Sequence, residues 1–323
     1  MSCLRRPGNR GMALLLVLVI VTLLTALLME LAFSTLVDMR LTETFRDTTR
    51  AHYLARGGID AGRMLLLQDR NAFDAPQEPW SQGIINYPVG QGTVSVGIQD
   101  LDGRLAINQL VRGSNPQALT VDRFYRLFAG LGIDHLADPA ELTAALIDWL
   151  DPDDEPYPMI MTDDRNIPVN GAEDLFYQSR GDPYSCKNGP LETLEELLLI
   201  RGFSRELLDL LRPHLAVNGS SRININTASA AVLGSLDEAM DTQVVELIEE
   251  TRQETPISDM EQLEDKLPVE SYSLLKSLAN QGRLGTTSDF YRIRATALVN
   301  DGMRELTANI NKQGNVLLFL KVD

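Results

Sequence analysis

The hydrophobic pattern of the chain is strongest near its N-terminus. Residues 12–29 form an apolar run that only Thr22 and Thr25 interrupt. Eighteen residues make about 27 Å of helix at ~1.5 Å per residue, which nearly spans the hydrocarbon core of a bilayer. Apolar residues resume after Glu30 and continue to residue 37, so a tilted helix can complete the span. The pattern predicts a transmembrane helix over residues 12–37.

Helical periodicity continues beyond this apolar run. Residues 37–67 contain no proline, and their apolar positions recur near the spacing of an α-helix. These positions are Val37, Leu41, Phe45, Tyr53, Leu54, Ile59, Met64 and Leu65. We therefore expect one long helix that leaves the membrane and packs on a folded head.

Alternating apolar and polar residues predict strands in two separate parts of the chain. Residues 93–98 alternate with period two, and residues 104–108 follow across Asp102-Gly103, which suggests a hairpin. Three more strands are expected at 291–299, 303–310 and 316–322, with turns rich in asparagine and glycine. The pattern predicts an antiparallel sheet with one apolar face, which the long helix can cover.

The region between the two groups of strands has a helical pattern. Many of its predicted helices begin with a capping residue or proline and end near glycine or proline. They cover residues 121–130, 139–150, 191–200, 204–215, 229–236, 242–253, 258–263 and 269–278. The predicted fold class is α+β, with a head built from residues 38–112 and 286–323 and an all-helical insertion over residues 113–285.

The charge balance is strongly acidic and narrows the range of partners. There are 45 acidic and 29 basic residues, which give a net charge of −16. Such a chain repels phosphate backbones and attracts cations, so we expect no nucleic-acid partner. The basic residues near the start, Arg5, Arg6 and Arg10, precede the apolar run without any acidic residue. By the positive-inside rule the N-terminus stays cytoplasmic and the rest of the chain faces outward.

One segment favours a different class of protein. Residues 199–203 resemble a helix-hairpin-helix turn, and residues 223–228 resemble part of membrane-anchored competence proteins that bind DNA. Residues 190–285, however, hold 17 acidic and 8 basic residues, which opposes phosphate binding. We interpret the segment as a helical packing unit. A membrane-anchored helix-hairpin-helix binding protein remains an alternative.

An acidic loop is the best candidate for a binding site. Nine carboxylates and one basic residue, Arg165, lie between Asp148 and Asp174, on a segment broken by proline and glycine. Crowded oxygen ligands on flexible loops suit Ca²⁺, although the spacing is not that of an EF-hand. A merely solvated acidic loop is the other interpretation. Paired carboxylates can also hydrolyse glycosides, but no aromatic-rich segment surrounds them, so we expect no enzymatic activity.

The dipeptide Gly11-Met12 ends a short basic leader immediately before the apolar run. This arrangement resembles the type IV prepilin leader, in which a peptidase cuts after the glycine and the apolar helix is kept. A cleaved export signal and a plain signal anchor are the alternatives. Most pilins have glutamate at the fifth mature position, whereas this chain has Leu16 there. Together with the helical insertion, this resembles the general secretion pathway protein K family, the K-type minor pseudopilins of type II secretion.

The resemblance implies a role, a location and partners. Prepilin peptidase would remove residues 1–11, leaving an N-terminal Met12 that can be methylated, in a single-pass protein of the bacterial inner membrane with a periplasmic C-terminal domain. The subunit would form a pseudopilus tip with I- and J-type minor pseudopilins and would contact the major pseudopilin and the inner-membrane assembly platform. A minor pilin of a type IV pilus is the alternative.

The resemblance also implies a structural Ca²⁺ site. The family resemblance in the acidic loop rests on its Asp-Trp-Leu-Asp-x-Asp-Asp stretch, a later Gly-Ala-Glu-Asp and an Asn-Gly-Pro. It implies a loop that binds two calcium ions. The ligands expected in this sequence are Asp151, Asp153, Asp154, Glu173, Asp174 and Asn188.

Overall fold

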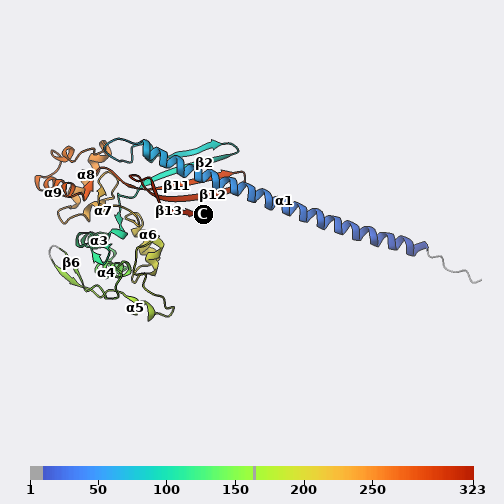
Figure 1. The fold of residues 1–323 in the computed structure, drawn as a ribbon, viewed down its shortest axis with the longest axis horizontal. Coiled ribbons are helices and arrows are strands. Elements are labelled where there is room, and N and C mark those ends of the chain that lie inside the picture. The colour runs from blue at the N-terminus through green and yellow to red at the C-terminus, as the bar shows by residue number, and fades with distance from the viewer. Residues whose placement is uncertain (1–9, 163–164) are drawn as a thin grey trace, which may run out of the picture.

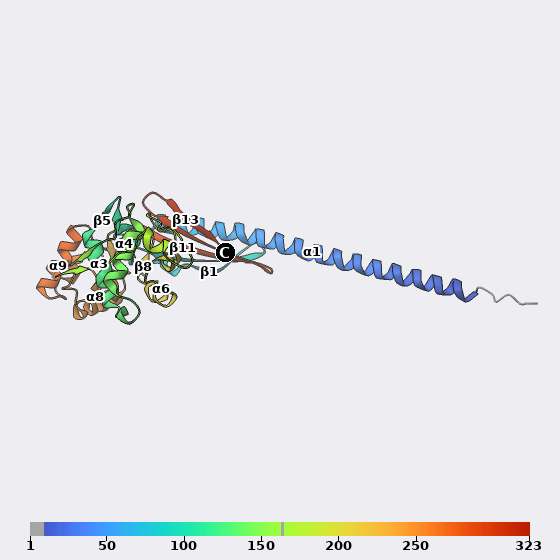
Figure 2. The same cartoon turned by 90° about the horizontal axis from the view of Figure 1, so that it is seen from below.

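One long helix projects from a folded head (Figures 1 and 2). The computed structural model describes residues 10–162 and 165–323, and helix α1 runs from Arg10 to Gln68. Side chains 11–42 of α1 are exposed, and burial of one helix face begins at Asp47. The apolar part of α1 is long and hydrophobic enough to cross a membrane, which agrees with the predicted transmembrane helix. Gly11 and Met12 lie in its first turn, whereas residues 1–9 of the expected leader lie outside the described residues.

The head is built on a five-stranded antiparallel sheet. The strand order is β1-β2-β11-β12-β13, so strands from the two ends of the sequence meet where β2 pairs with β11. The bounds are β1 Ile84–Val89, β2 Gly92–Asp100, β11 Phe290–Val299, β12 Gly302–Asn311 and β13 Val316–Val322. A short helix, α2 (Pro79–Gln82), precedes β1. The C-terminal half of α1 covers one face of this sheet.

Two glycines let α1 lie close to the sheet. A Cβ atom added at Gly58 would be 2.9 Å from the Cβ of Ala295, and one added at Gly62 would be 2.8 Å from Ile293 Cγ2. Separations below 3 Å are repulsive, so larger residues at either position would push the helix away. The glycines in this helical pattern therefore serve packing, and the resulting core includes Ala51, Ala55, Val96 and Leu306.

A second, larger core belongs to an insertion between β2 and β11. Its α-helices are α3 Ala118–Gly130, α4 Pro139–Leu150, α5 Asp174–Gln178, α6 Arg205–Leu211, α7 Ala230–Gly234, α8 Thr242–Glu254 and α9 Val269–Asn280. Its 3₁₀-helices are η1 Ile107–Gln109, η2 Ile133–His135, η3 Leu194–Leu199 and η4 Met260–Leu263. Short strands complete it: β3 Leu105–Ala106, β4 Val111–Arg112, β5 Asn115–Pro116, β6 Met159–Met161, β7 Asn166–Pro168, β8 Leu215–Ala216, β9 Ile223–Asn224 and β10 Leu284–Gly285. Helix α4 is at the centre of this core, because its residues are almost all buried.

Buried polar groups join the insertion to the head. The Asp102 carboxylate accepts hydrogen bonds from the backbone N–H groups of Ser220, Asp289 and Phe290, at 2.8, 2.6 and 3.1 Å. The Asn224 amide donates to Ser288 Oγ at 2.7 Å and to the Asp100 carboxylate at 3.1 Å. These bonds fix the two connections between the head and the insertion, one at the end of β2 and one at the start of β11.

The structure confirms the α+β fold class and most of the predicted elements. Strand β13 has the predicted bounds, and so does helix α4. The predicted strand 104–108 and its hairpin with 93–98 are wrong, because Leu105 and Ala106 instead pair in parallel with β8 of the insertion. The Asp102 carboxylate directs the chain out of the sheet at this point. The core of the insertion therefore begins at Leu105, earlier than the expected boundary at residue 113.

Candidate metal centre

The candidate site is formed where helix α4 ends. Asp138 caps the start of α4 by accepting from the backbone N–H groups of Ala140 and Glu141, at 2.8 and 3.1 Å. A side-chain acceptor at this position satisfies N–H groups that have no partner within the helix. The helix ends at Leu150, and Asp151 is extended with φ −80° and ψ 159°. The acidic loop therefore starts at a rigid, buried helix end.

Three of the expected ligands lie together. Asp151, Asp153 and Glu173 each contribute a carboxylate oxygen, and these oxygens lie within 4.8 Å of one another. Asp151 is 4% exposed and Glu173 is 3% exposed, whereas Asp153 is exposed. Residues far apart in the loop thus converge where the end of α4 lies beside the start of α5. We call Asp151, Asp153 and Glu173 the carboxylate cluster.

The buried oxygens of this cluster lack hydrogen-bond donors among the described residues. Both Glu173 carboxylate oxygens and Asp151 Oδ1 are buried and accept no hydrogen bond. Glu173 occupies the N-cap position of α5, yet its side chain does not cap that helix. A buried carboxylate without donors is costly unless a cation or a proton compensates it. The donor set consists of hard oxygens, so the residues fit Ca²⁺.

The pKa values of the cluster indicate the same need for positive charge. Burial raises the pKa of Glu173 to about 8, and the neighbouring Asp148 and Asp151 carboxylates add to this shift. Burial also raises the pKa of Asp151 to about 7, with further contributions from Asp153 and Asp148. Desolvation and like charges both disfavour the ionised form. A bound divalent cation would reverse this balance.

Asn188 reaches the same loop from a distant part of the chain. Its Nδ2 donates to the backbone oxygen of Asp153 at 2.9 Å and to Asp154 Oδ1 at 3.1 Å. Its Oδ1 is buried and accepts no hydrogen bond from the described residues. Asn188 is thus held beside the carboxylate cluster with a free oxygen. Its backbone φ of 47° is in the left-handed region, which asparagine tolerates better than most residues.

The remaining two expected ligands lie outside the carboxylate cluster. Asp154 accepts from Asn188 and is exposed. Asp174 lies in the first turn of α5, where its Oδ1 accepts from the backbone N–H of Cys186 at 2.9 Å. This hydrogen bond fixes the segment that leads to Asn188. The structure therefore brings three of the six expected residues together in the carboxylate cluster, and Asn188 is joined to one of them through the backbone oxygen of Asp153.

Asp148 was not among the expected ligands, but it shapes the site. This fully buried carboxylate accepts from the backbone N–H groups of Tyr157, at 2.8 Å, and Ala172. A Cβ atom at Gly171 would overlap Asp148 Oδ2, so only glycine fits there. Burial raises the pKa of Asp148 to about 6. A lone aspartate inside the apolar end of a helix was the signal that could have identified it.

Arg201 holds the far side of the loop against α4. Its guanidinium donates to the backbone oxygens of Gly171, at 3.1 Å, and Asn170, and pairs with Glu141 at 2.5 Å. Arg201 belongs to the turn that resembles a helix-hairpin-helix motif. The neighbouring Ile200 and Phe203 are buried in the insertion core. In this structure the turn therefore positions the acidic loop and packs the insertion.

A second group of carboxylates lies where α1 ends. Asp69, Asp74 and Glu78 also bring carboxylate oxygens within 4.8 Å of one another. There, however, Lys312 pairs with Asp69 at 2.9 Å and with Asp74 at 3.1 Å, and Glu78 accepts from Trp80 Nε1 at 3.0 Å. Protein donors thus already bind carboxylate oxygens of that group.

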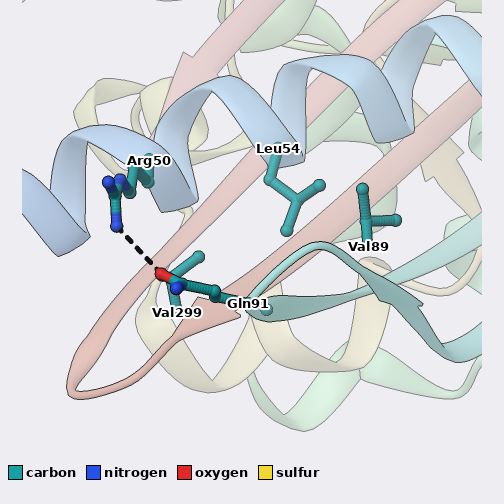
Figure 3. A pocket seen from close by; sticks show the side chains of 6 residues that line it. Arg50, Leu54, Val89, Gln91 and Val299 are labelled. Carbon is teal, nitrogen blue, oxygen red and sulfur yellow. Dashed lines mark hydrogen bonds between the residues drawn. The ribbon is translucent and has the colours of Figure 1, made fainter.

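A hollow of about 300 Å³ lies between α1 and the β1–β2 hairpin (Figure 3). Arg50 donates to Gln91 Oε1 across it at 3.1 Å, and Leu54, Val89 and Val299 supply apolar walls. Of the described residues that line it, Arg50 alone is ionisable. It offers no comparable ligand set and instead ties the hairpin to the helix.

Comparison with known proteins gives a consistent result. Residues 103–219, which include the candidate site, match the family model for type II secretion system (T2SS), protein K. The chain is 29% identical over 242 residues to type II secretion system protein K of Klebsiella pneumoniae, covering 71% of this chain and 70% of that protein. It is 28% identical over 242 residues to the protein of the same name from Pseudomonas aeruginosa, covering 72% and 69%.

The fold also resembles a solved structure. A chain in the crystal structure of the GspK-GspI-GspJ complex from the enterotoxigenic Escherichia coli type 2 secretion system aligns with a TM-score of 0.59. The alignment covers 90% of this chain and 99% of that chain, with 19% sequence identity. At this identity the match establishes the shared fold.

Proposed function

We propose that this chain forms the tip of the pseudopilus. It belongs to the type II secretion system protein K family and is therefore a minor pseudopilin of that system. In this position it would initiate or cap assembly of the filament that exports folded proteins across the outer membrane. The role is structural, and the energy for assembly would come from other components.

The shape of the molecule carries this proposal. The exposed N-terminal half of α1 can pack in parallel with the helices of other pilin-like subunits. The insertion widens the head far beyond the five-stranded sheet that α1 covers. Such a head would collide with subunits stacked above it in a filament shaft. The apex is the position where it has room.

The transmembrane segment supports the same position. Leu16 occupies the place where most pilins have a glutamate that pairs with the N-terminal ammonium of a neighbour. An unpaired carboxylate inside a membrane is costly, so a subunit without that neighbour is better served by leucine. We propose that prepilin peptidase cuts after Gly11 and that Met12 begins the mature chain. The N-terminus would face the cytoplasm and the head the periplasm.

The proposed partners are other subunits of the same system. The solved relative forms a complex with GspI and GspJ. We expect this chain to join I- and J-type minor pseudopilins through helix packing, and to meet the major pseudopilin and the inner-membrane assembly platform. No nucleic-acid partner is expected, because the net charge is −16.

We also propose that the acidic loop binds structural Ca²⁺. The carboxylate cluster and the free oxygen of Asn188 offer ligands for one ion, and Asp154 lies beside them as a candidate for a second. A bound Ca²⁺ would supply positive charge that links the end of α4 to the start of α5. The residues of this chain then hold the loop in place: Asp148 and Arg201 bind its backbone.

Gene deletion and complementation test the proposed role. A strain lacking this chain is expected to retain type II cargo in the periplasm, and a plasmid encoding the full chain should restore export. Type IV pili should be unaffected. Normal cargo export with loss of pili would instead identify a type IV minor pilin. A strain unaffected in both respects would indicate a membrane-anchored binding protein without a filament role.

A further inference from the structure

The two edges of the head sheet differ in how they are protected. Exposed strand edges have unpaired backbone groups and can join other chains, so proteins often block them with proline or bulges. Strand β1 contains Pro88 and a register shift between Ile84 and Tyr87, where Asn86 has a φ of 49°. The hydrogen bond between Arg50 and Gln91 also ties the β1–β2 hairpin to α1 (Figure 3). The β1 edge is therefore blocked.

The opposite edge, strand β13, is open from Phe319 onward, beyond a bulge of its own. Its sequence is apolar except for Lys321 and contains no proline, and among the described residues it pairs only with β12. A register shift leaves Leu318 as an extra residue, and the strand then pairs regularly with β12 from Phe319 onward. Leu320 is 44% exposed and Val322 is 48% exposed. Helix α1 packs mainly on β12, β11 and β2 and leaves this strand uncovered.

The ladder shows which backbone groups are free. Asp323 N–H donates to the oxygen of Glu305 at 2.9 Å, and Glu305 N–H donates back at 3.4 Å, so these two residues form a hydrogen-bonded pair. Hydrogen-bonded and non-hydrogen-bonded pairs alternate along an antiparallel ladder. Leu320 and Val322 therefore direct their N–H and C=O groups away from β12. Their partners, Ala308 and Leu306, are buried on the face that α1 covers, so the side chains of Leu320 and Val322 also lie on that face.

The other face of β13 borders a polar cleft of about 440 Å³ between the sheet and the insertion. Arg292 lines this cleft and donates to Asn309 Oδ1 at 3.2 Å, but no carboxylate of the described residues lies within 4.0 Å of it. The other three cations that line the cleft do have carboxylate partners: Arg212, Arg294 and Lys321. An extended segment along β13 would thus meet apolar side chains on one face and the border of this polar cleft on the other.

Helix α1 indicates where such a segment comes from. Arg63 donates to Asn315 at 2.9 Å and so marks the side of α1 that borders β13. Phe45 and Leu27 precede Arg63 by about five and ten helical turns at 3.6 residues per turn, so both lie on the same side. Both are exposed, Phe45 at 75%. An apolar helix of another membrane-anchored chain could follow this side of α1 and bring its own head to β13.

We propose that the outer edge of β13 accepts an extended strand from the head of a neighbouring pseudopilin, which joins the sheet as a sixth strand. The strand alternates between apolar residues on the α1 face and polar residues on the cleft face. This inference rests on the proposed function, since it names the partner as another subunit of the same assembly.

Hydrogen exchange on the full chain tests the proposal. The chain is purified in detergent micelles, alone and co-expressed with the I- and J-type minor pseudopilins of its host. In the complex, amides of residues 316–323 are expected to exchange at least tenfold more slowly, while those of β1 do not change. A complex in which residues 316–323 exchange as in the free chain overturns the strand proposal and leaves the proposed function intact.

The other outcomes are also decisive. Absence of any complex with both partners contradicts the proposed function and the strand proposal with it. Protection of residues 316–323 in the purified chain alone, increasing with its concentration, would identify a second copy as the occupant and overturn the choice of partner.

A matched pair of variants isolates the backbone contact. Val322→Pro removes an outward N–H group that β12 does not use, so the fold should persist while partner binding weakens about tenfold. Val322→Thr keeps the N–H group and should bind as the wild type does. Equal binding by both variants, each with an unchanged melting temperature, would contradict strand addition.

Discussion

At the scale of single residues, the acidic loop combines buried carboxylates with few donors. Glu173 lies at a helix N-cap, but its side chain caps no backbone N–H group, and its carboxylate oxygens remain unsatisfied by the described residues. Asp151 and Asn188 Oδ1 share this property. Carboxylates with a purely structural role, such as Asp102, instead accept several backbone N–H groups. This difference separates the carboxylates of the proposed cation site from carboxylates that stabilise the fold.

Replacing Glu173 tests the cation site. A cation that binds only the folded state stabilises it by about 2.7 kcal/mol at a hundredfold excess over its Kd. Millimolar Ca²⁺ should raise the melting temperature of the wild-type chain, and Glu173→Gln should abolish most of this increase. The exposed Asp182 provides a control, because Asp182→Asn should leave the Ca²⁺ effect unchanged. A wild-type melting temperature that is insensitive to both Ca²⁺ and EDTA would contradict the site.

The raised pKa values predict how pH affects the stabilisation of the fold by Ca²⁺. The pKa is about 7 for Asp151 and about 8 for Glu173 in the folded chain, well above the values of an unfolded chain. The unfolded state therefore loses these protons first, and the metal-free fold becomes less stable as pH rises from about 4 to about 8. Ca²⁺ requires the ionised carboxylates, so its stabilising effect should be larger at pH 8 than at pH 5.5. Melting curves at both pH values check this, and an equal Ca²⁺ effect at the two would contradict it.

Gly171 allows a second test at this scale. Because a Cβ atom there would overlap Asp148 Oδ2, Gly171→Ala should destabilise the chain by about 1–3 kcal/mol, the usual range for overpacking. A Cβ atom at Gly181 would have no other atom within 4 Å, so Gly181→Ala is the matched control and should be nearly neutral. Denaturant unfolding compares the two. Similar stability of both variants would show that Gly171 is not constrained.

At the scale of helices and strands, sequence periodicity predicted the bounds of elements better than it predicted which strands pair. The α4 and β13 bounds follow from their apolar patterns and flanking turn residues. The hairpin expected at Asp102-Gly103 is absent, because tertiary hydrogen bonds to Asp102 outweigh the local turn preference. Strand β1 was missed because its residues are mostly exposed and include a proline. Asp148 could not be assigned from spacing alone, since its partners Tyr157 and Ala172 depend on how the loop folds back.

Adjacent glycines in α1 test the packing of helix on sheet. Gly58→Ala would place a Cβ atom 2.9 Å from Ala295 and should destabilise the head by about 1–3 kcal/mol. A Cβ atom added at Gly57 would meet no atom of another element within 4 Å, so Gly57→Ala should be neutral or stabilise by up to about 1 kcal/mol through helix propensity. Unfolding of the two full-length variants in the same detergent measures the difference. If Gly57→Ala were less stable than Gly58→Ala, α1 would have to pack on the sheet through another face.

At the scale of the whole molecule, a slender apolar helix carries a wide two-part head (Figures 1 and 2). In the proposed tip position, the helix would associate laterally in the membrane, and the insertion would prevent another subunit from stacking on top. The resemblance of the sequence to the K family predicted this architecture, and the family and fold comparisons agree with it. The open β13 edge was not foreseen, because a strand pattern does not tell which strand lies at the border of a sheet.

The mature N-terminus decides whether this chain is a pilin-class subunit anchored by its retained helix. The measurement is the intact mass of the protein purified from membranes of a host with active prepilin peptidase. We expect a chain that begins at Met12, with or without N-methylation, and a Gly11→Val variant that keeps residues 1–11. A wild-type chain that still begins at Met1 in such a host would contradict the pilin-class assignment and leave a signal-anchored protein.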